Sequence, residues 1–460
     1  MTDSLEGKKI VILGLARQGI ALAEWLADIG AKPVVSDLRT EEQLLGPLKA
    51  LRRLPIEFVL GGHPLTLLDG ASMVCLSGGV PPQIPFVQEA AKRGIKISND
   101  AQLFIERAPC DVIGITGSAG KTTSTSLVGK MFDETDRLAW VGGNIGNPLI
   151  TDLPYIRADE IAVMELSSFQ LEIMTTSPRV AAILNITPNH LDRHKTMEAY
   201  IRAKRNIIDH QIVGDVAVLG YDDPVAASLT GHVQASMALF SAKVPIDVGA
   251  WLEGDQIVVR PRFEAIKEPV CRLSEIPLRG SHNVLNVLAA CAIAGVAGVP
   301  TVAMRAAILT FKPVPHRLQP VGEVKGATYV NDSIATAPER VVAALHAFTE
   351  PLILLLGGRD KDLPWDDMLT LALKRSRAII TFGEAGSMIA DKVDALNRRL
   401  DARVTLAEMA TLEDAVAAAH RLAQPGDVVL LSPGGTSFDA YADFEQRGEH
   451  FRQLVEILAM

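Results

Sequence analysis

The sequence has no excess of basic residues. Its 45 lysines and arginines are outnumbered by 54 acidic residues, and the formal net charge is -9. Proteins that bind nucleic acids usually carry a basic footprint, and proteins held on anionic lipid usually carry a polybasic patch. We therefore expect neither a nucleic acid nor a membrane among its partners. An anionic small molecule is not excluded, because a local pocket can be positive on an acidic protein.

Cysteines and long apolar runs are also scarce. The four cysteines are Cys75, Cys110, Cys271 and Cys291. None forms a CxxC pair, so we expect reduced and mostly buried thiols. The N-terminus lacks the apolar run of a signal peptide. The longest apolar stretch, near 284–300, falls short of the ~20 apolar residues that a membrane span needs and predicts a buried helix. These features predict a cytoplasmic protein.

The sequence does contain short Val/Ile/Leu runs that alternate with longer helical patterns. This alternation is typical of parallel sheets covered by helices. We predict an α/β protein of three domains, spanning 1–98, 99–313 and 314–460. The expected strands are 9–13, 33–36, 111–116, 161–165, 180–185, 352–356, 378–382 and 427–431, with a helix at 20–29.

A glycine-rich loop follows the expected strand 111–116 and opens a helix. It consists of Gly117, Ser118, Ala119, Gly120, Lys121, Thr122 and Thr123. Glycines let backbone N–H groups approach phosphate oxygens, and a helix N-terminus adds its positive end. Lys121 can reach the outer phosphates and Thr122 can bind Mg²⁺. The spacing is GxxGKT, with Ile115 where GxxxxGKT needs its first glycine, so a subfamily with a shorter loop is favoured over an ordinary P-loop GTPase or kinase.

A second glycine-bounded turn, 14–19, lies after the first expected strand. It has the outer glycines of GxGxxG but Ala16 in the middle, and Asp37 ends the next strand. A dinucleotide-dependent dehydrogenase, another binder of a nucleoside diphosphate and a plain tight turn are all compatible with this pattern. Of these, a protein that binds a nucleoside diphosphate other than a nicotinamide dinucleotide is favoured over a dehydrogenase.

Polar residues follow two strands of the second domain. Glu165 ends a buried strand, where a carboxylate can hold Mg²⁺. His190, Asp192 and His194 follow the strand 180–185. A ligand or catalytic role is favoured for His190 more than for His194. Taken alone, Lys204 predicts a solvated lysine on a helix.

Several motifs occur together in one order. They are GSAGKTT (117–123), GGNIGNPL (142–149), ELSSFQLE (165–172), ILNITPNHLDRH (183–194), Lys204, GSHNVLNVLAA (280–290), PHRLQ (315–319), NDSIAT (331–336), LLLGGRDKD (354–362) and LLSPGGTSFDAYADFEQRG (430–448). On these motifs the chain resembles the Mur ligase family over nearly its whole length. ELSSFQLE and the C-terminal motif resemble the glutamate-adding branch rather than the later ligases or folylpolyglutamate synthetase.

The resemblance implies a Rossmann-like first domain that binds the uridine diphosphate part of a substrate, a P-loop ATPase-like central domain with a mostly parallel sheet, and a Rossmann-like third domain that binds glutamate. The implied substrate-binding residues are Leu15, Ala16, Asp37, Leu38, Arg39, Ser77, Gly78, Gly79 and Asn144. Those implied for ATP are the loop 117–123 with Asn286, Arg317 and Asp332. Those implied for glutamate are Thr336, Lys361, Ser437 and Phe444.

The implied catalytic residues are Lys121, Glu165, His190 and Lys204. The resemblance implies two Mg²⁺ ions, one held by Thr122 and Glu165, the other by His190 and by a carbamate on Lys204. The implied reaction phosphorylates the carboxylate of UDP-N-acetylmuramoyl-L-alanine with ATP, and the amine of D-glutamate then displaces phosphate. The implied protein is a monomer that takes part in cytoplasmic peptidoglycan precursor synthesis.

Three departures from the family pattern bear on specificity. Ile334 stands where lysine is common, so a cationic contact to ATP is absent or comes from a neighbour such as Arg340. Ala119 stands where asparagine is frequent, and Gly434-Gly435 replace small non-glycine residues. L-glutamate therefore stays open as the added amino acid. A folylpolyglutamate-synthetase-like ligase and a non-catalytic P-loop switch are less favoured functions of the same sequence.

Overall fold

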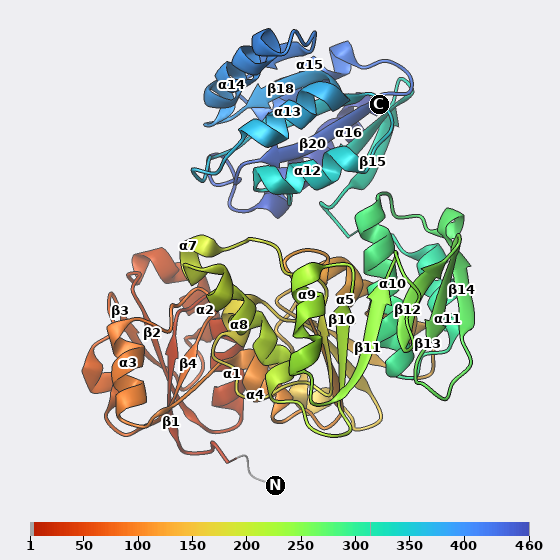
Figure 1. The fold of residues 1–460 in the computed structure, drawn as a ribbon. Coiled ribbons are helices and arrows are strands. Elements are labelled where there is room, and N and C mark those ends of the chain that lie inside the picture. Colours follow the sequence, from red (N-terminus) through yellow and green to blue (C-terminus); the bar gives the residue numbers. More distant parts are fainter. Residues whose placement is uncertain (1–3, 313, 460) are drawn as a thin grey trace. The chain divides into compact units, whose positions relative to one another are not determined.

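The computed structural model describes residues 4–312 and 314–459 (Figure 1). The chain forms two compact units. The first comprises 1–276 with 285–311, and the second comprises 277–284 with 312–460.

The first sheet of unit one is parallel and five-stranded, in the order β3-β2-β1-β4-β5. Its strands are β1 (Lys9–Leu13), β2 (Lys32–Asp37), β3 (Glu57–Leu60), β4 (Ala71–Leu76) and β5 (Lys96–Ser98). Its helices are α1 (Arg17–Asp28), α2 (Leu45–Leu51), α3 (Pro85–Lys92) and α4 (Asp100–Ile105). Ile10 and Ile12 pack in one core with α1, α2 and α4, whereas Val11 and Leu13 pack with α3. Because the helices after β1 and β4 leave to opposite faces, the loops after these strands flank a switch point where ligands bind in open α/β sheets.

The central sheet of unit one has nine strands in the order β14-β13-β12-β11-β10-β9-β6-β8-β7. They are β6 (Asp111–Thr116), β7 (Ala139–Gly143), β8 (Ile161–Glu165), β9 (Val180–Ile183), β10 (Val216–Gly220), β11 (Ser236–Ser241), β12 (Gly249–Glu253), β13 (Gln256–Arg260) and β14 (Glu268–Arg272). Strands β12 to β14 pair antiparallel and extend an otherwise parallel sheet. The helices are α5 (Lys121–Asp133), α6 (Ser168–Leu171), α7 (Leu191–His194), α8 (Met197–Asp209), α9 (Pro224–Ser228), α10 (Ser281–Val296) and α11 (Thr301–Thr310).

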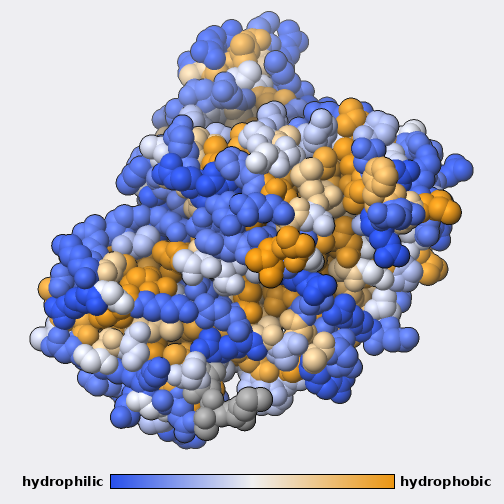
Figure 2. All heavy atoms as spheres, turned by 60° about the horizontal axis from the view of Figure 1, so that its bottom comes forward, coloured by the Kyte–Doolittle hydropathy of each residue, from blue (hydrophilic) through white to orange (hydrophobic). Residues whose placement is uncertain are grey.

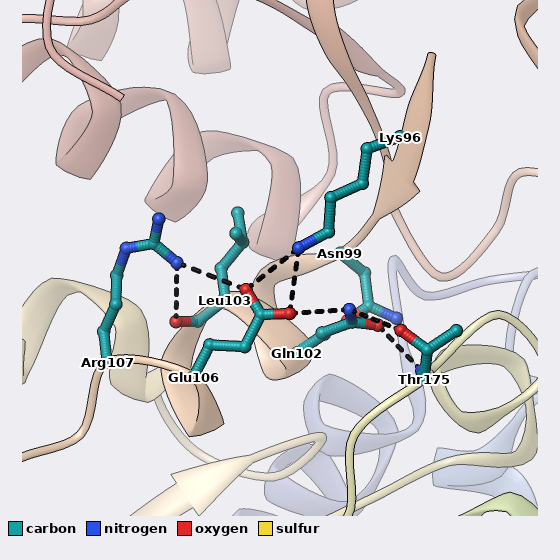
Figure 3. A network of polar contacts seen from close by, with 7 residues as sticks. All are labelled: Lys96, Asn99, Gln102, Leu103, Glu106, Arg107 and Thr175. Carbon is teal, nitrogen blue, oxygen red and sulfur yellow. Dashed lines mark hydrogen bonds and ion pairs between the residues drawn. The ribbon is translucent and has the colours of Figure 1, made fainter. Parts of the chain in front are cut away.

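A polar network joins the first sheet to the central one (Figure 3). The Lys96 ammonium lies 3.0 Å from the Glu106 carboxylate. The Gln102 amide donates to Glu106 and, at 3.0 Å, to the hydroxyl of Thr175, which follows α6. Since Lys96 pairs with Met73 near the amino end of β4, this network lies at the edge opposite to the loop after β4.

The sheet of unit two has the order β15-β16-β20-β17-β18-β19. Its strands are β15 (Gln319–Val324), β16 (Ala327–Asn331), β17 (Leu352–Gly357), β18 (Ser376–Phe382), β19 (Thr405–Glu408) and β20 (Val428–Gly434). Its helices are α12 (Pro338–His346), α13 (Asp366–Arg375), α14 (Gly386–Arg399), α15 (Leu412–Leu422) and α16 (Phe444–Ala459). Helices α12 to α14 cover one face and α15 and α16 the other, so β17 and β20 flank a second switch point.

The predicted α/β architecture is confirmed, with corrected bounds. The first helix begins at Arg17 rather than at residue 20, β9 ends at Ile183 rather than at 185, and β20 continues to Gly434. The expected buried helix near 284–300 is α10, which ends at Val296. The four cysteines are buried and free.

Apolar side chains reach the surface at several places. On the face shown in Figure 2, orange apolar groups lie among blue hydrophilic ones. The most exposed large apolar residues, Val213 and Ile266, belong to different loops of unit one. Among the described residues, no helix combines the length and apolarity that crossing a membrane requires.

Candidate active site

The glycine-rich loop lies at the carboxyl end of β6, between β9 and β8. Its backbone is held by Asn185, whose amide oxygen accepts from Ala119 N at 2.9 Å and whose amide nitrogen donates to Ala119 O at 3.1 Å. The Lys121 ammonium folds back onto Gly117 O at 2.8 Å. Asn185 was not among the predicted site residues, although it belongs to the motif ILNITPNHLDRH.

Gly120 brings a second segment to the loop. It has a left-handed backbone with φ of 84°, and a Cβ there would lie 2.2 Å from Oδ1 of Asn286 on α10. The Ser124 hydroxyl also donates to Asn286 O at 3.3 Å. The structure therefore places Asn286, predicted to contact the adenine, directly beside the phosphate loop.

Thr122, Glu165 and Asn144 meet at the ends of β6, β8 and β7. The Thr122 hydroxyl donates to Glu165 Oε2 at 2.8 Å, and the Asn144 amide donates to Glu165 Oε1 at 2.8 Å. Glu165 is only 2% exposed, so both carboxylate oxygens are fixed in direction. A hydroxyl and a carboxylate are hard oxygen donors that suit Mg²⁺, which takes its remaining ligands from phosphate and water. In the described part of the chain, no cluster of three or more histidines, cysteines and acids could hold a metal.

Lys204 is buried rather than solvated, which corrects the interpretation of this residue taken alone. Its side chain on α8 is 1% exposed, and Nζ donates to Gly117 O at 2.8 Å and to the Thr116 hydroxyl at 3.2 Å. Burial, reinforced by the charge of Lys121, lowers the pKa of Lys204 well below its usual range, and Glu165 opposes this only in part.

The two histidines of the loop after β9 have different surroundings. His190 is exposed, has φ of 54°, and its ring lies 5.0 Å from that of Phe169. His194 is buried, stacks on Phe169 at 5.5 Å and bonds the Ser168 hydroxyl through Nε2 at 3.0 Å. His194 is thus fixed in packing, while His190 faces the surface. The Asp192 side chain lies outside the described part of the structure.

The residues predicted to meet the uracil gather at the first sheet. Asp37 accepts Leu15 N at 2.7 Å and a forked pair of bonds from the Arg39 guanidinium at 2.8 and 3.0 Å. Burial raises the pKa of Asp37, but the bonds from Arg39 and Leu15 outweigh it and lower that pKa to about 2. Leu38 is 70% exposed and Ala16 is also exposed, so two exposed apolar residues adjoin in sequence the two residues, Leu15 and Asp37, that are bonded to each other.

The residues predicted to meet the diphosphate form the turn after β4. Ser77 is buried, and Val80 N donates back to Ser77 O at 2.9 Å. Gly78 N donates to the amide oxygen of Gln18, in the first turn of α1, at 3.2 Å. The turn after β4 is therefore tied to the start of the helix that follows β1.

In unit two, Asp332 is bonded to β20 and to the segment just before β15. Asp332 accepts Leu318 N at 3.2 Å and the Ser432 hydroxyl at 2.8 Å. Burial raises the pKa of Asp332 to about 7, against the lowering effect of these bonds. Arg317 lies in the adjoining segment, and its charge also acts to lower that pKa.

The residues predicted to bind glutamate come from the loops after β16, β17 and β20. Because β16 and β17 both pair in parallel with β20, these loops leave the sheet at the same edge. Ser437 is buried, Thr336 is half-buried and Lys361 is exposed. Phe444 starts α16 with its ring 6.3 Å from that of His316.

Arg447 organises these loops and was not predicted from the sequence. Its fully buried guanidinium donates to Ser333 O at 2.9 Å, to Thr436 O at 3.0 Å and to Gly435 O at 3.2 Å. Burial lowers the pKa of Arg447 to about 10. The residue belongs to the C-terminal motif, but only the packing of α16 shows which carbonyls it holds.

Comparison with known proteins defines the class. Residues 8–99 match a model of the Mur ligase MurD-like N-terminal domain, 115–294 the Mur ligase middle domain, and 316–435 the Mur ligase glutamate ligase domain. The chain therefore belongs to the Mur ligase family, whose members are ATP-dependent amide ligases.

Within the family, the similar proteins include several named UDP-N-acetylmuramoylalanine–D-glutamate ligase. That of Acidobacterium capsulatum is 39% identical, with 98% of this chain and 96% of the relative covered. That of Clostridioides difficile is 38% identical, with 99% of both chains covered. That of Pelotomaculum thermopropionicum is 36% identical, also with 99% of both covered.

Solved structures support the fold. A UDP-N-acetylmuramate-alanine ligase MurC of Thermotoga maritima superposes with a TM-score of 0.60 at 18% identity, covering 98% of this chain and 99% of that one. A pseudomurein peptide ligase type C of Methanothermus fervidus gives 0.59 at 18% identity, covering 98% and 100%. At this identity the likeness concerns the fold alone.

Proposed function

We propose that this chain joins D-glutamate to UDP-N-acetylmuramoyl-L-alanine at the expense of ATP, in peptidoglycan precursor synthesis. The names of relatives that are 36–39% identical over nearly the whole chain support this substrate pair. The structural observation that carries it is the arrangement at the carboxyl ends of β6, β7 and β8, where Thr122, Glu165 and Asn144 are joined beside Lys121.

We assign the three substrates to three parts of the chain. Residues 1–98 would bind the uridine diphosphate part, residues 99–313 ATP, and residues 314–460 glutamate. The fixed Asp37 beside exposed Leu38 supports the first assignment, because a carboxylate and an apolar edge suit a nucleobase. The phosphate loop beside Asn286 supports the second. Lys361 with the hydroxyls of Thr336 and Ser437 supports the third, since each oxygen of a dicarboxylate needs donors.

The chemistry follows from the poor electrophilicity of a carboxylate. Transfer of a phosphoryl group from ATP to the alanyl carboxylate gives an acyl phosphate, and the glutamate amine then attacks its carbonyl and releases phosphate. The protein must hold two anions together and neutralise developing charge. Lys121 would leave Gly117 O for the transferred phosphate, and Thr122 and Glu165 would hold Mg²⁺. The bound ion would supply charge neutralisation during phosphoryl transfer.

The surroundings of Lys204 support a carbamate on this residue. Only a neutral amine adds to carbon dioxide, and the pKa of Lys204 lies well below its usual range because of burial. Addition of carbon dioxide to the neutral amine, with release of one proton, would place an anionic oxygen ligand beside Lys121. With His190 this carbamate would hold a second Mg²⁺, for which it supplies the hard oxygen donor that the ion prefers.

The proposed setting is the cytoplasm, and the proposed state is a monomer with no nucleic acid or membrane partner. Four free, buried cysteines support a reducing compartment. The net charge of -9 supports the absence of polyanionic partners.

The test is an assay of phosphate release from ATP with Mg²⁺ and UDP-N-acetylmuramoyl-L-alanine, with D- and L-glutamate in separate reactions and products identified by mass spectrometry. Release and a new amide with D-glutamate only are expected. Product with L-glutamate only would keep the mechanism and overturn the stereochemistry, and Ile334 and Gly434-Gly435 would then be the residues to exchange. Nucleotide binding without any amide product would favour a P-loop switch.

A further inference from the structure

Two arginines cross between the first sheet and the central sheet in opposite directions. Arg17, the first residue of α1 after the loop that follows β1, donates to Asn144 O after β7 at 2.8 Å. Arg193, after β9, donates to Val80 O at 3.0 Å and Gly79 O at 3.4 Å in the turn after β4. Each arginine thus leaves a proposed binding segment of one sheet and fixes main-chain carbonyls in a proposed binding segment of the other.

Arg17 donates to Asn144, the residue whose side chain orients the Glu165 carboxylate. Asn144 contacts Glu165 twice, through its side-chain amide at 2.8 Å and through its backbone N–H to Glu165 O at 2.8 Å. Gly142 and Gly143 before it belong to β7 and pair with Met164 and Glu165 of β8. The N–H and the side-chain amide of Asn144 are thus bonded to Glu165, while its carbonyl oxygen accepts from Arg17. Asn144 therefore links the start of α1 to Glu165.

Arg193 acts on the segment that carries His190. The short helix α7 lies between two non-glycine residues of positive φ, His190 at 54° and Lys195 at 67°. Such conformations persist only where the surroundings over-determine them. The half-buried guanidinium of Arg193 lies 5.3 Å from the centre of the Phe169 ring and 3.7 Å from the Glu172 carboxylate. Phe169 in turn contacts the His190 ring.

The contacts of Arg17 and Arg193 differ in position from those that hold the two sheets together. The apolar core shared by both sheets and the network of Lys96, Gln102 and Thr175 already hold the sheets together (Figure 3). Arg17 and Arg193 instead engage glycine-rich loops at the carboxyl edges, where ligands bind. A ligand that orders either loop would therefore act on the carbonyl oxygens to which these arginines donate.

We propose that Arg17 and Arg193 are reciprocal positioning residues, through which binding of the uridine diphosphate sugar to the first sheet sets the geometry of Glu165 and His190 on the central sheet. This inference rests on the proposed function, because it takes the loops after β1 and β4 as the sugar nucleotide site. The observable consequence is a coupling of two affinities. The sugar nucleotide tightens binding of Mg²⁺–ATP, and by linkage Mg²⁺–ATP tightens binding of the sugar nucleotide by the same factor.

The experiment uses the full chain and titrates Mg²⁺ with a non-hydrolysable ATP analogue, with and without saturating UDP-N-acetylmuramoyl-L-alanine, by calorimetry. In the wild type we expect a coupling of about 5-fold or more. Arg17→Gln and Arg193→Gln should each reduce it to less than about twofold, while the affinity for the analogue alone stays at the wild-type value. Arg17→Lys and Arg193→Lys retain the charge and one donor, and should restore part of the coupling.

The matched control is Arg137→Gln. Arg137 also donates to backbone carbonyls, of Asp159 at 3.2 Å and Glu160 at 3.0 Å, but within the central sheet. It should keep the wild-type coupling. Melting temperatures identify any glutamine variant that fails to fold. At such a position, the coupling measured for the lysine variant tests the proposal instead.

The outcomes separate the two proposals. Wild-type coupling in both glutamine variants overturns the positioning role, as does the absence of coupling in the wild type. Equal loss of analogue affinity with and without the sugar nucleotide assigns these arginines a purely structural role and also overturns it. A wild type that neither binds the sugar nucleotide nor forms an amide would instead overturn the proposed function.

Discussion

At the residue scale, the most informative feature is one carbonyl that accepts from two lysines. Lys121 and Lys204 both donate to Gly117 O at 2.8 Å. Two ammonium groups on one oxygen repel each other strongly where water is excluded. The conflict is relieved when the more buried group, Lys204, is neutral, which is the direction of its pKa shift. A neutral buried amine is a nucleophile, whereas a solvated helix lysine is not.

Replacing Lys204 with alanine should lower amide formation by at least about 100-fold, because it removes the carbamate proposed to hold the second Mg²⁺ and with it the charge stabilisation which that ion would supply. Short carboxylic acids such as formate should restore part of the activity, because they can occupy the position of the carbamate. The measurement is the initial rate of product formation. Lys130→Ala, whose ammonium pairs with Glu134 near the end of α5, should leave the rate unchanged. Wild-type activity in Lys204→Ala, or no rescue by any acid tested, would count against the carbamate.

The buried Asp332 should make unit two less stable as the pH rises. Its folded-state pKa of about 7 lies above the ordinary value of 3.8, so the folded state holds the proton more tightly. Its favourable contribution is present below pH 3.8 and is lost as the pH rises through about 7. Between pH 5 and pH 7, Asp332→Asn should gain about 2–3 kcal/mol of stability relative to the wild type.

This gain is measured by hydrogen exchange of β16 and β20 amides at the two pH values, after correction for intrinsic rates. Asp391→Asn, on the exposed side of α14, serves as the control and should show no such difference. A constant difference between wild type and Asp332→Asn at both pH values would show that Asp332 does not titrate in this window.

How much of the site the sequence could predict depends on how local each interaction is. The family resemblance implies that Thr122 and Glu165 hold the same Mg²⁺. The structure brings the two residues together because β6, which leads into the loop before Thr122, and β8, which ends at Glu165, are neighbouring parallel strands that end at the same edge of the sheet. The burial of Lys204 could not be predicted from its own segment, since a lysine on an amphipathic helix is solvated unless that helix packs beneath a loop. Arg447 was missed for the same reason, because its acceptors lie in two loops that are distant in sequence.

At the scale of elements, the sequence predicts strands best where they are fully buried. Strands β6, β8 and β17 are almost entirely buried and appear where expected. The predicted strands stop at residue 185 and resume at 352, so β10 to β16 were not named. Some of these have only a short buried run: β14, at the edge of its sheet, buries two of its five residues, and β12 buries three. Such short runs give a weak pattern.

The junction of β6 and α5 depends on glycine at one position. Gly120→Ala should weaken binding of a non-hydrolysable ATP analogue and lower stability by about 1–3 kcal/mol, because a Cβ meets both an unfavourable φ and the Asn286 side chain. Gly298→Ala is the matched control, since Gly298 has φ of 90° with open space around its Cβ position. It should carry the backbone cost alone and retain nucleotide affinity. Equal affinity in the Gly120 variant would argue that Asn286 moves aside freely.

At the scale of the whole molecule, the proposed binding segments of two sheets occupy the same position in the topology, beside a switch point. In the first sheet, the helices after β1 and β4 pack on opposite faces. In unit two, the helices after β17 and β20 do the same. A crevice at the carboxyl ends of such strands is where open α/β sheets bind ligands. The same architecture can thus present a nucleoside diphosphate to one edge and an amino acid to another, with only the loop residues changed.

The assignment of one substrate to each part of the chain predicts three separate patterns of protection in hydrogen exchange of the full chain. The sugar nucleotide should protect amides after β1, β2 and β4, and the ATP analogue with Mg²⁺ should protect 117–123. Glutamate, added last, should protect the loops after β16, β17 and β20. The reason is that ordering a glycine-rich loop on a ligand suppresses its local opening, while the strands beneath it already exchange slowly. Protection of residues 314–460 by the sugar nucleotide alone would contradict the assignment, because unit two would then bind the substrate that the first sheet is proposed to hold.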